Sequence, residues 1–322
     1  MKKLLVIVVT YNSMRWLERC LSSIPAWADV YAFDNDSTDG SADFVKAHYP
    51  KAKLVRSTEN LGFSRPNNLG VQWAIDHGYD YVYLMNSDAW LEAGALEKLV
   101  TASEAHPQYG VLSPLQMTDG YKELDKQFAK VLGSAGSIPP KTHGHPRPCK
   151  REGPYACRAD GGRGSSEARE VFGGILPAEP VSVRRVMAAH WLVPVAVIKR
   201  IGFFAEGLFP HWGQDDEWCQ RLYFYGLKVG VVEEARGVHD RAYRQDPVET
   251  LVKRNYYTGS LVRLCNPARS IFLTFLFILP FTFVKALKYR SLLPFKYFRQ
   301  LVQNLPLVRA HRSLLRTRAQ NA

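Results

Sequence analysis

The stretch Leu4-Leu5-Val6-Ile7-Val8-Val9-Thr10-Tyr11-Asn12 decides the fold class, because an apolar run passes directly into a polar triplet. Six apolar residues are too few for the core of a signal peptide, and no small-residue cleavage site follows them. The run is instead typical of a strand that is buried in a parallel sheet. No Gly-x-Gly-x-x-Gly follows it, which argues against a nicotinamide-dependent enzyme.

The chain up to about residue 115 alternates strand-like and helix-like segments. Further strands are expected at Val30–Phe33, Lys53–Ser57 and Tyr79–Met85, and helices at Ser13–Ile24, Ser41–His48, Asn67–His77 and Glu92–His106. Strands separated by helices in this way predict right-handed βαβ units. The sequence therefore predicts an α/β fold, with a mostly parallel central sheet that is flanked by helices.

Polar motifs follow three of the predicted strands. Thr10-Tyr11-Asn12 follows the first strand, Asp34 follows the second and Asn86-Ser87-Asp88 follows the fourth. Ligands of open parallel sheets bind at the carboxyl ends of the strands, so these side chains are expected to share one site. Two simpler interpretations remain, namely an Asx turn at Asp34 and a helix N-cap at Asp88.

The middle of the chain lacks a regular pattern. Prolines and glycines interrupt every candidate element between Gly133 and Glu179, which predicts a long loop or a partly ordered insertion. His143, His145, Cys149 and Cys157 lie in this segment, but their spacing matches no standard zinc site. Regular structure is expected again at Val181–Leu192, Val195–Ile201, Asp215–Tyr225 and Lys228–Val232, the last of which leads to His239.

Three consecutive acids, Asp215-Asp216-Glu217, open the helix predicted after Trp212-Gly213-Gln214. The helix dipole favours negative charge at this end, so a charged helix terminus is one interpretation. The polar motifs at the strand ends favour another, in which one of these acids is a catalytic base.

The net charge of +12 belongs to the C-terminal segment. Residues 251–322 contain thirteen Lys and Arg and no Asp or Glu, so the rest of the chain carries about −1. A nearly neutral body disfavours nucleic-acid binding, whereas a basic and apolar tail favours an anionic membrane surface.

The apolar run Ile271–Val284 contains Pro280 and is fourteen residues long. A helix of this length would span only ~21 Å of a hydrocarbon core of ~30 Å, so an interfacial or re-entrant position is expected. Residues 263–318 as a whole are predicted to contact the membrane surface. The alternative is a tail that packs on the protein's own body.

The five cysteines are Cys20, Cys149, Cys157, Cys219 and Cys265, an odd and scattered set. Because the sequence shows no export signal, reduced thiols and a cytoplasmic location on the inner face of the cell membrane are expected.

The motifs, taken in order, identify a resemblance. Val-Val-Thr10-Tyr11-Asn12, Asp34-Asn-Asp36-Ser-Thr-Asp-Gly, Glu-Asn60-Leu-Gly62-Phe, Leu-Met-Asn86-Ser-Asp88 and Gly-Gln-Asp215-Asp-Glu217-Trp-Cys resemble those of the family 2 glycosyltransferases, which have the GT-A fold. The resemblance covers about residues 4–118 and 181–245. It points to bacterial rhamnosyl- and hexosyltransferases of surface polysaccharide synthesis.

The resemblance implies a role for each motif residue. Thr10, Tyr11 and Asn12 would hold a pyrimidine ring, and Asp34 would accept a hydrogen bond from the base and the ribose. Asp88, the last residue of a motif that in relatives reads Asp-x-Asp, would bind Mn²⁺ or Mg²⁺ together with His239. The other residues implied for the nucleotide-sugar are Asp36, Asn60, Gly62, Arg65, Asn68, Asn86 and Ser87.

The second motif group would act on the acceptor. Asp215 is the implied base and Asp216 its nearest rival, while Glu217 would orient the acceptor. Trp212 and Trp218 offer flat faces to a sugar ring, although core packing is the more common role of tryptophan. Asn86 and Gln214 stand where relatives often carry a carboxylate, which leaves open a catalytically weak, membrane-bound scaffold subunit.

The expected organisation has two parts. Residues 1–250 would form the GT-A domain, made of a nucleotide-sugar half (1–118), an irregular insertion (119–180) and an acceptor half (181–250), and residues 251–322 would form the helical tail. The implied activity is an inverting, metal-dependent transfer of a sugar, with rhamnose favoured, from a dTDP- or UDP-sugar to a glycan or lipid-linked acceptor.

Overall fold

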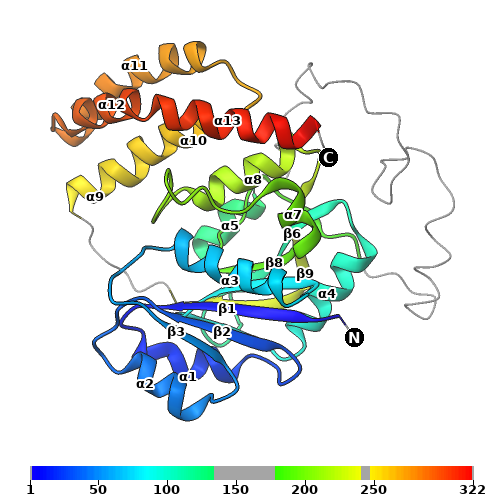
Figure 1. The fold of residues 1–322 in the computed structure, drawn as a ribbon. Coiled ribbons are helices and arrows are strands. Elements are labelled where there is room, and N and C mark those ends of the chain that lie inside the picture. The colour runs from blue at the N-terminus through cyan, green and yellow to red at the C-terminus, as the bar shows by residue number, and fades with distance from the viewer. Residues whose placement is uncertain (1, 134–177, 241–246, 321–322) are drawn as a thin grey trace, which may run out of the picture.

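The computed structural model describes residues 2–133, 178–240 and 247–320. Its strands are β1 (Leu4–Thr10), β2 (Asp29–Asp34), β3 (Lys53–Arg56), β4 (Tyr81–Asn86), β5 (Ala89–Leu91), β6 (Tyr109–Met117), β7 (Val181–Ser182), β8 (His190–Pro194) and β9 (Lys228–His239). Together they form one nine-stranded sheet in the order β3-β2-β1-β4-β8-β6-β9-β5, with β7 paired to β9 (Figure 1).

The helices of the body are α1 (Met14–Ser22), α2 (Ser41–His48), α3 (Ser64–Asp76), α4 (Ala95–Ala105), α5 (Lys126–Leu132), α7 (Val195–Ile201) and α8 (Gln214–Phe224). The tail contains α9 (Val248–Val252), the π-helix η1 (Lys253–Thr258), α10 (Gly259–Cys265), α11 (Ile271–Tyr289), α12 (Leu293–Gln303) and α13 (Leu305–Gln320).

The parallel strands place the polar motifs at one edge of the sheet, as the sequence predicts. Strand β1 pairs in parallel with β2 and β4, and the register sets Thr10 beside Asp34 and Val9 beside Asn86. The three strands therefore end at the same level. The loops that follow them converge at this edge.

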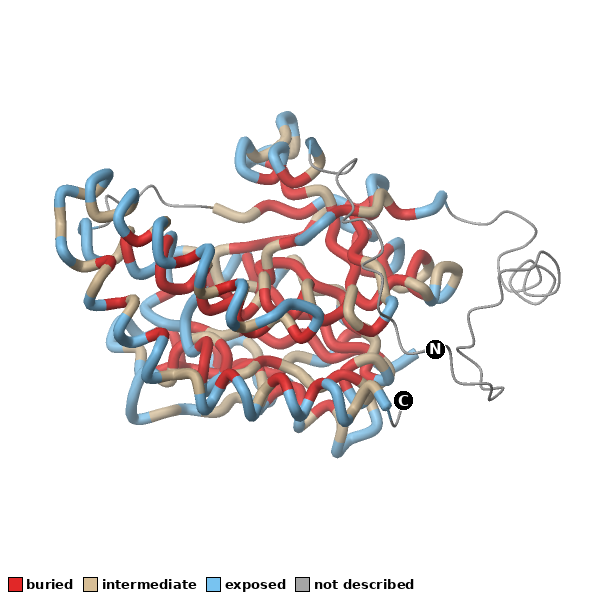
Figure 2. Tube along the Cα trace, turned by 90° about the horizontal axis from the view of Figure 1, so that it is seen from above, coloured by how far each residue is buried: buried red, intermediate tan, exposed pale blue. Residues whose placement is uncertain are grey.

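Alternate residues of β1 pack into two different cores. Leu5 and Ile7 face α3 and α8, whereas Leu4, Val6 and Val8 face α1, α2 and α4. A strand that is covered on both faces needs apolar residues at every position, which explains its unbroken run. Figure 2 shows these buried segments gathered in the middle of the molecule. The predicted α/β class is confirmed.

Two strands differ from the sequence-based expectation. Strand β8 runs antiparallel between β4 and β6, within the stretch expected to be one element at Val181–Leu192. Strand β5 lies between the motif Asn86-Ser87-Asp88 and Glu92, where no strand was expected, and α4 starts at Ala95 rather than at Glu92. Both short strands take their partners from remote parts of the chain, so local periodicity gives no sign of them.

Most of the predicted insertion 133–179 lies outside the described residues, as do His143, His145, Cys149 and Cys157. The flanking residue Pro180 is described, and its carbonyl accepts a hydrogen bond of 2.7 Å from the Tyr109 hydroxyl. The chain therefore rejoins the sheet beside β6.

Helix α11 is longer than the apolar run predicts. It contains 19 residues and ends at Arg290, which has a φ of 47°. The helix spans about 28 Å and meets the length criterion for crossing a membrane, which corrects the estimate of ~21 Å. The pattern failed here because Lys285 and Lys288 end the apolar run but not the helix, whose C-terminal dipole favours cations.

The inward faces of the tail helices form a third core with the body. Leu208 and Phe209 of the body pack with Tyr256, Leu261, Ile278, Tyr297, Leu301 and Val308. Helix α13 then lies across α8, where the Tyr225 hydroxyl donates a hydrogen bond of 2.7 Å to the Leu315 carbonyl. For the buried sides of α12 and α13, the alternative of packing on the protein's own body therefore applies.

Candidate active site

The loops that follow β1 and β2 are joined by hydrogen bonds. The Thr10 hydroxyl donates to Asp34 Oδ1 over 2.9 Å, and the backbone N–H of Ser37 donates to Asp34 Oδ2 over 3.1 Å. Asn12 Oδ1 accepts from the N–H of Thr38 at 2.9 Å. The Asp34 carboxylate is thus fixed in place, while the Tyr11 side chain beside it is 52% exposed. This arrangement suits a ring that is stacked on Tyr11.

Asn35 connects the loop after β2 to the loop at residues 60–62. Its amide donates to Asn60 Oδ1 at 3.0 Å and to the Gly62 carbonyl at 2.8 Å, and its Oδ1 accepts from Leu61 N–H at 2.7 Å. Gly62 has a φ of +80°, and a Cβ at this position would lie 2.6 Å from the Pro210 carbonyl oxygen. Only glycine permits this close approach between the loop at 60–62 and the loop before α8.

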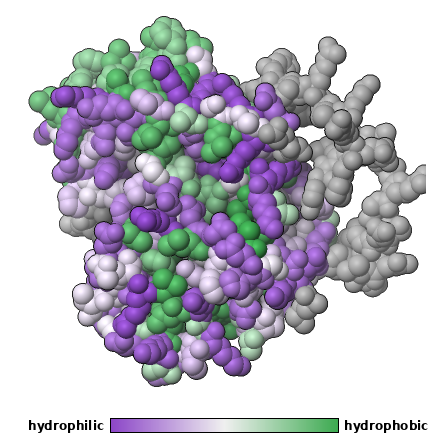
Figure 3. Space-filling view, in the orientation of Figure 1, coloured by the Kyte–Doolittle hydropathy of each residue, from purple (hydrophilic) through white to green (hydrophobic). Residues whose placement is uncertain are grey.

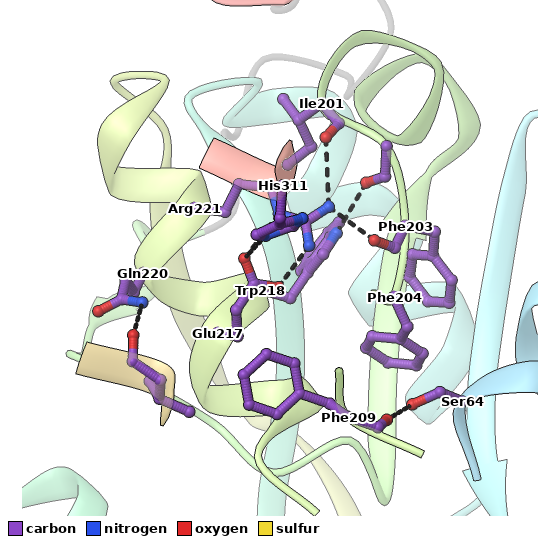
Figure 4. A network of polar contacts seen from close by, with 12 residues as sticks. Ser64, Ile201, Phe203, Phe204, Phe209, Glu217, Trp218, Gln220, Arg221 and His311 are labelled. Atoms are coloured by element: carbon purple, nitrogen blue, oxygen red, sulfur yellow. Dashed lines mark hydrogen bonds and ion pairs between the residues drawn. The ribbon is translucent and has the colours of Figure 1, made fainter. Parts of the chain in front are cut away.

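Hydrogen bonds complete this junction between the two loops. The N–H groups of Phe63 and Ser64 donate to the Pro210 carbonyl at 2.7 and 3.1 Å. The Ser64 hydroxyl donates to the Phe209 carbonyl (Figure 4). The loops after β1 and β2 and the loop that leads into α8 are therefore one connected unit.

Three residues implied for the nucleotide-sugar make close contacts within the protein. Asn60 Oδ1 accepts hydrogen bonds from Asn35 Nδ2 and from the N–H of Gly62, and Gly62 packs on the loop before α8. Asn68 donates to the Phe204 carbonyl and to Glu206, each at 2.9 Å, so it anchors α3 to the segment 204–206. Among the other implied residues, Arg65 and Asp36 have exposed side chains.

Asp88 and His239 meet at the end of the sheet. Strand β5 pairs with the last residues of β9, which brings His239 Nε2 within 3.3 Å of Asp88 Oδ1 and 3.4 Å of Asn86 Nδ2. Ser87 Oγ lies 2.7 Å from Ser13 Oγ and so connects this motif to the β1 loop. The N-cap interpretation of Asp88 is wrong, because Gly94 occupies the N-cap position of α4.

The electrostatics keep Asp88 ionised. Burial by itself would raise the pKa of Asp88, but the hydrogen bond and the charge of His239 outweigh it and hold the pKa below its usual range. His239 Nδ1 is buried and has no hydrogen-bond partner in the described part of the chain. The site therefore presents one carboxylate and one imidazole.

Asp88 and His239 alone suit a cation that is held mainly by phosphate groups of a bound molecule and by water. No group of three or more His, Cys, Asp or Glu side chains placed to hold a metal occurs among residues 2–133, 178–240 and 247–320. Mg²⁺ is commonly held by one or two carboxylates together with substrate phosphates and water. Asp88 and His239 match such a site, with a diphosphate supplying the remaining oxygens.

Asp215 has the properties of a base. It lies in the first turn of α8, behind Gly213, which has a φ of +86°. Burial and the neighbouring charge of Asp216 raise the pKa of Asp215 to about 7. Asp216 itself accepts a hydrogen bond of 2.5 Å from Arg185 Nη1. Because a general base works best with a pKa near the operating pH, Asp215 fits the role better than Asp216.

Glu217 and Trp218 do not face an acceptor, which corrects the roles implied for them. Glu217 is 1% exposed and bonds to Arg221 and to His311 Nε2, the latter at 2.9 Å. Burial opposes ionisation of Glu217, but the charge of Arg221 and the His311 contacts lower its pKa to about 2. Trp218 is fully buried and donates to the Gly202 carbonyl at 2.9 Å (Figure 4).

The Trp212 ring is 37% exposed just before α8, so it remains available to contact a bound molecule. Two residues at the site were missed from the sequence, namely Arg185 and His311. They contact partners 31 and 94 residues away, respectively, and belong to no local motif. No pattern in the chain marks them.

The family model of glycosyl transferase family 2 matches residues 5–137. The chain carries a family 2 glycosyltransferase domain. This match includes the corner at Thr10 and Asp34 and the motif Asn86-Ser87-Asp88. Asp215 and His239 lie outside it, so their assignment depends on the geometry described above.

Several known proteins are similar to this glycosyltransferase domain and its surroundings. An N-acetylglucosaminyl-diphospho-decaprenol L-rhamnosyltransferase of Mycobacterium tuberculosis is 32% identical over 122 residues, which are 34% of this chain and 40% of that relative. The dTDP-rhamnosyl transferase RfbF of Shigella flexneri is 22% identical over 263 residues, or 78% of this chain and 75% of the relative.

One solved structure supports the fold. The crystal structure of S. aureus TarS is 18% identical, with a TM-score of 0.50, and the likeness covers 84% of this chain and 41% of that one. At this identity the likeness concerns the fold alone.

Proposed function

We propose that this protein is an inverting glycosyltransferase that moves a sugar from a nucleotide diphosphate-sugar to a hydroxyl group of an acceptor. The observation that carries the proposal is the pairing of two features on one connected unit. The Thr10–Asp34 corner suits a nucleotide, and Asp215, with a pKa of about 7, follows the loop that packs against this corner through Gly62.

The residues divide the work in a single displacement step. Asp215 removes the proton of the acceptor hydroxyl, and the oxygen attacks the anomeric carbon from the side opposite the diphosphate. The bond from the anomeric carbon to the diphosphate oxygen breaks, and its electron pair leaves with the nucleotide. Asp88 and His239 would hold Mn²⁺ or Mg²⁺, which neutralises charge on the leaving diphosphate.

The donor is proposed to be dTDP-rhamnose. Two relatives with similar sequences are named rhamnosyltransferases, and one of those names specifies dTDP. Asp34 is suited to accept from the N3–H of thymine, although uracil presents the same group. A UDP-hexose is therefore the second candidate donor.

The acceptor is proposed to be a lipid-linked glycan at the cytoplasmic face of the cell membrane, within the synthesis of a surface polysaccharide. Two relatives are named for polyprenyl-linked substrates. The long apolar helix α11 suits such an acceptor. It follows η1 and α10 in the chain, and η1 packs against Gly213, which precedes Asp215.

Calorimetric titration with dTDP and with UDP, each with and without Mn²⁺, tests the donor site. Tighter binding of dTDP that depends on Mn²⁺ and is weakened by Asp88→Ala is expected. Absence of binding of either nucleotide to folded protein would overturn the proposal.

A second assay separates a transferase from a scaffold. Release of dTDP from dTDP-rhamnose is measured with a diphospholipid that bears N-acetylglucosamine as acceptor. A transferase releases dTDP only with the acceptor present, and Asp215→Asn abolishes the release while nucleotide binding persists. Nucleotide binding by the wild type without turnover on this or other prenyl-linked glycans would favour the scaffold.

A further inference from the structure

Helix α11 carries a broad apolar face that no other part of the described chain covers. Its large side chains are strongly exposed, with Leu287 at 80% and Phe272 at 71%. Leu273, Phe277, Phe283 and Leu292, just beyond the helix, extend the same face. Hydrophobic residues gather over this part of the molecule in Figure 3. A contiguous apolar surface of this kind marks a site of interaction with a protein or a membrane.

The opposite face of α11 is fixed to the protein. Thr274, Ile278 and Thr282 are buried, and Ile278 belongs to the core that holds Tyr256 and Leu301. The Thr282 hydroxyl lies 2.6 Å from the Tyr256 hydroxyl. If α11 crossed a membrane alone, this core would open and the Tyr256 hydroxyl would lose its partner. The helix therefore keeps one side on the protein.

Cations border the apolar face. Lys285 lies 4.7 Å from the centre of the Phe281 ring, and Arg263 lies 5.5 Å from the centre of the Phe277 ring. Lys288 and Arg290 follow at the C-terminal end of α11, and residues 251–322 contain no acidic side chain. An amphipathic helix with cations beside its apolar side lies in the headgroup region of anionic membranes. A protein partner would not require this excess of positive charge.

We infer that the exposed face of α11 is a docking surface that lies in the plane of an anionic lipid bilayer, within one leaflet. The loop of the base packs directly on the helices that carry this surface. A Cβ on Gly213 would lie 2.3 Å from Thr258 Cγ2, and Lys253 Nζ lies 5.9 Å from the centre of the exposed Trp212 ring. Docking thus holds Asp215 at a set height above the lipid. The inference stands independently of which sugar is transferred.

Sedimentation of the full chain with lipid vesicles tests the surface. Binding to vesicles of phosphatidylcholine mixed with phosphatidylglycerol, and much weaker binding to phosphatidylcholine alone, is expected. Removing two apolar side chains that enter the lipid should weaken binding by about tenfold or more, so the variant Phe272→Ser/Leu287→Ser is compared with Leu69→Ser/Leu314→Ser. The latter pair replaces exposed leucines on α3 and α13, away from the face. Equal binding by both variants, or no binding by the wild type, would overturn the inference.

Folding and orientation are checked separately. Both double variants should keep the wild-type circular dichroism and dTDP binding, since neither changes a residue of the proposed nucleotide site around Thr10 and Asp34. With vesicle-bound protein, an impermeant amine reagent trapped inside the vesicles should leave Lys285, Lys288 and Lys296 unmodified. Modification of these lysines from inside would show that α11 spans the bilayer, which contradicts the in-plane position.

Discussion

At the scale of single residues, Asp215 and Asp216 show how neighbours on one helical turn acquire different chemistry. Asp216 bonds to Arg185, whereas Asp215 Oδ1 accepts a hydrogen bond of 3.0 Å from the backbone N–H of Asp216. The charge of Asp216 then adds to burial in raising the pKa of Asp215 to about 7. Asp216 therefore makes the carboxylate of Asp215 more basic.

The pH dependence of transfer follows from this pair. Because Asp215 must be ionised to accept a proton, kcat/KM should fall as the pH drops through about 7. Asp215→Asn should lose about 10²- to 10⁴-fold in kcat with little change in dTDP binding. Asp216→Asn removes a negative neighbour, so the acidic limb should move to lower pH. The release of dTDP measures kcat/KM as a function of pH. If both variants show the same pH profile as the wild type, the assignment of Asp215 as the base is wrong.

Buried His190 provides a second test at this scale, on stability. Its Nε2 donates to the Val238 carbonyl at 2.9 Å and its Nδ1 accepts from the Tyr83 hydroxyl at 2.8 Å. Burial lowers the pKa of His190 to about 4. Between that value and the ~6.5 of an unfolded histidine, only the unfolded chain binds the proton, so acidification favours unfolding.

The free energy of unfolding should consequently fall by on the order of 3 kcal/mol from His190 alone as the pH drops from about 6.5 to about 4. Urea titrations at a series of pH values measure this. His190→Gln can keep both hydrogen bonds and cannot titrate, so its loss over the same range should be smaller. An identical pH dependence in the two proteins would show that His190 is not the cause.

At the scale of elements, the start of α8 is positioned by contacts with two other parts of the fold. Arg221 donates to the carbonyls of Phe203 and Ile201 at 2.6 and 3.3 Å and pairs with Glu217. Glu217 in turn bonds to His311 of α13. A helix that is held along its buried side in this way presents its first turn, with Asp215, in one orientation.

Loss of the α13 contact should disturb both stability and catalysis. His311→Ala leaves an oxygen of the buried Glu217 without one partner, which should cost about 1–3 kcal/mol of unfolding free energy. Because His311 acts through α8, kcat should fall while the KM for the donor changes little. Leu307→Ser on the exposed side of α13 is the matched control. If His311→Ala reduces stability but leaves kcat as in the control, the network has no positioning role.

The junction between the loop at 60–62 and the loop before α8 is tested with two glycines. Gly62 and Gly78 both have positive φ, at +80° and +69°, but only a Cβ on Gly62 would meet neighbouring atoms. Gly78→Ala should cost about 1 kcal/mol from backbone strain alone, whereas Gly62→Ala should cost more and should weaken dTDP binding. Thermal unfolding and titration measure both. Equal losses in the two variants would mean that the close contact is unimportant.

At the scale of the whole molecule, the tail is an integral part of the folded unit. The Arg312 guanidinium of α13 donates to the Leu264 carbonyl at 3.0 Å. Leu315 of α13 packs in the core that also contains residues of β1, α3 and α8. The expected boundary at residue 250 thus separates segments that share two cores. The exposed side of α11 makes no such contact with the described residues.

Unfolding should therefore be a single transition. Far-ultraviolet circular dichroism, which reports all helices, and the fluorescence of buried Trp191 and Trp218 should give the same midpoint. A chain that ends at Thr250 should be insoluble or expanded, because it would expose Phe209 and the partners of α13. An early transition that affects only circular dichroism would show that the tail folds separately.

The sequence by itself determined the elements whose signal is local. The apolar run at Leu4–Val9 predicts a buried strand, and polar residues after successive parallel strands must share an edge, because such strands run in one direction. Thr10, Asp34 and Asn86 are therefore found together. The acids at Asp215 were likewise visible as a helix start.

Only the tertiary structure decided which side chains are available for chemistry. Glu217 and Trp218 stand one and two positions after Asp216 but face inward, because a helix turns successive residues in different directions. Arg185, His311 and Gly62 acquire their roles from partners far along the chain. Such contacts depend on how the sheet and the tail pack, and no local spacing of residues encodes them.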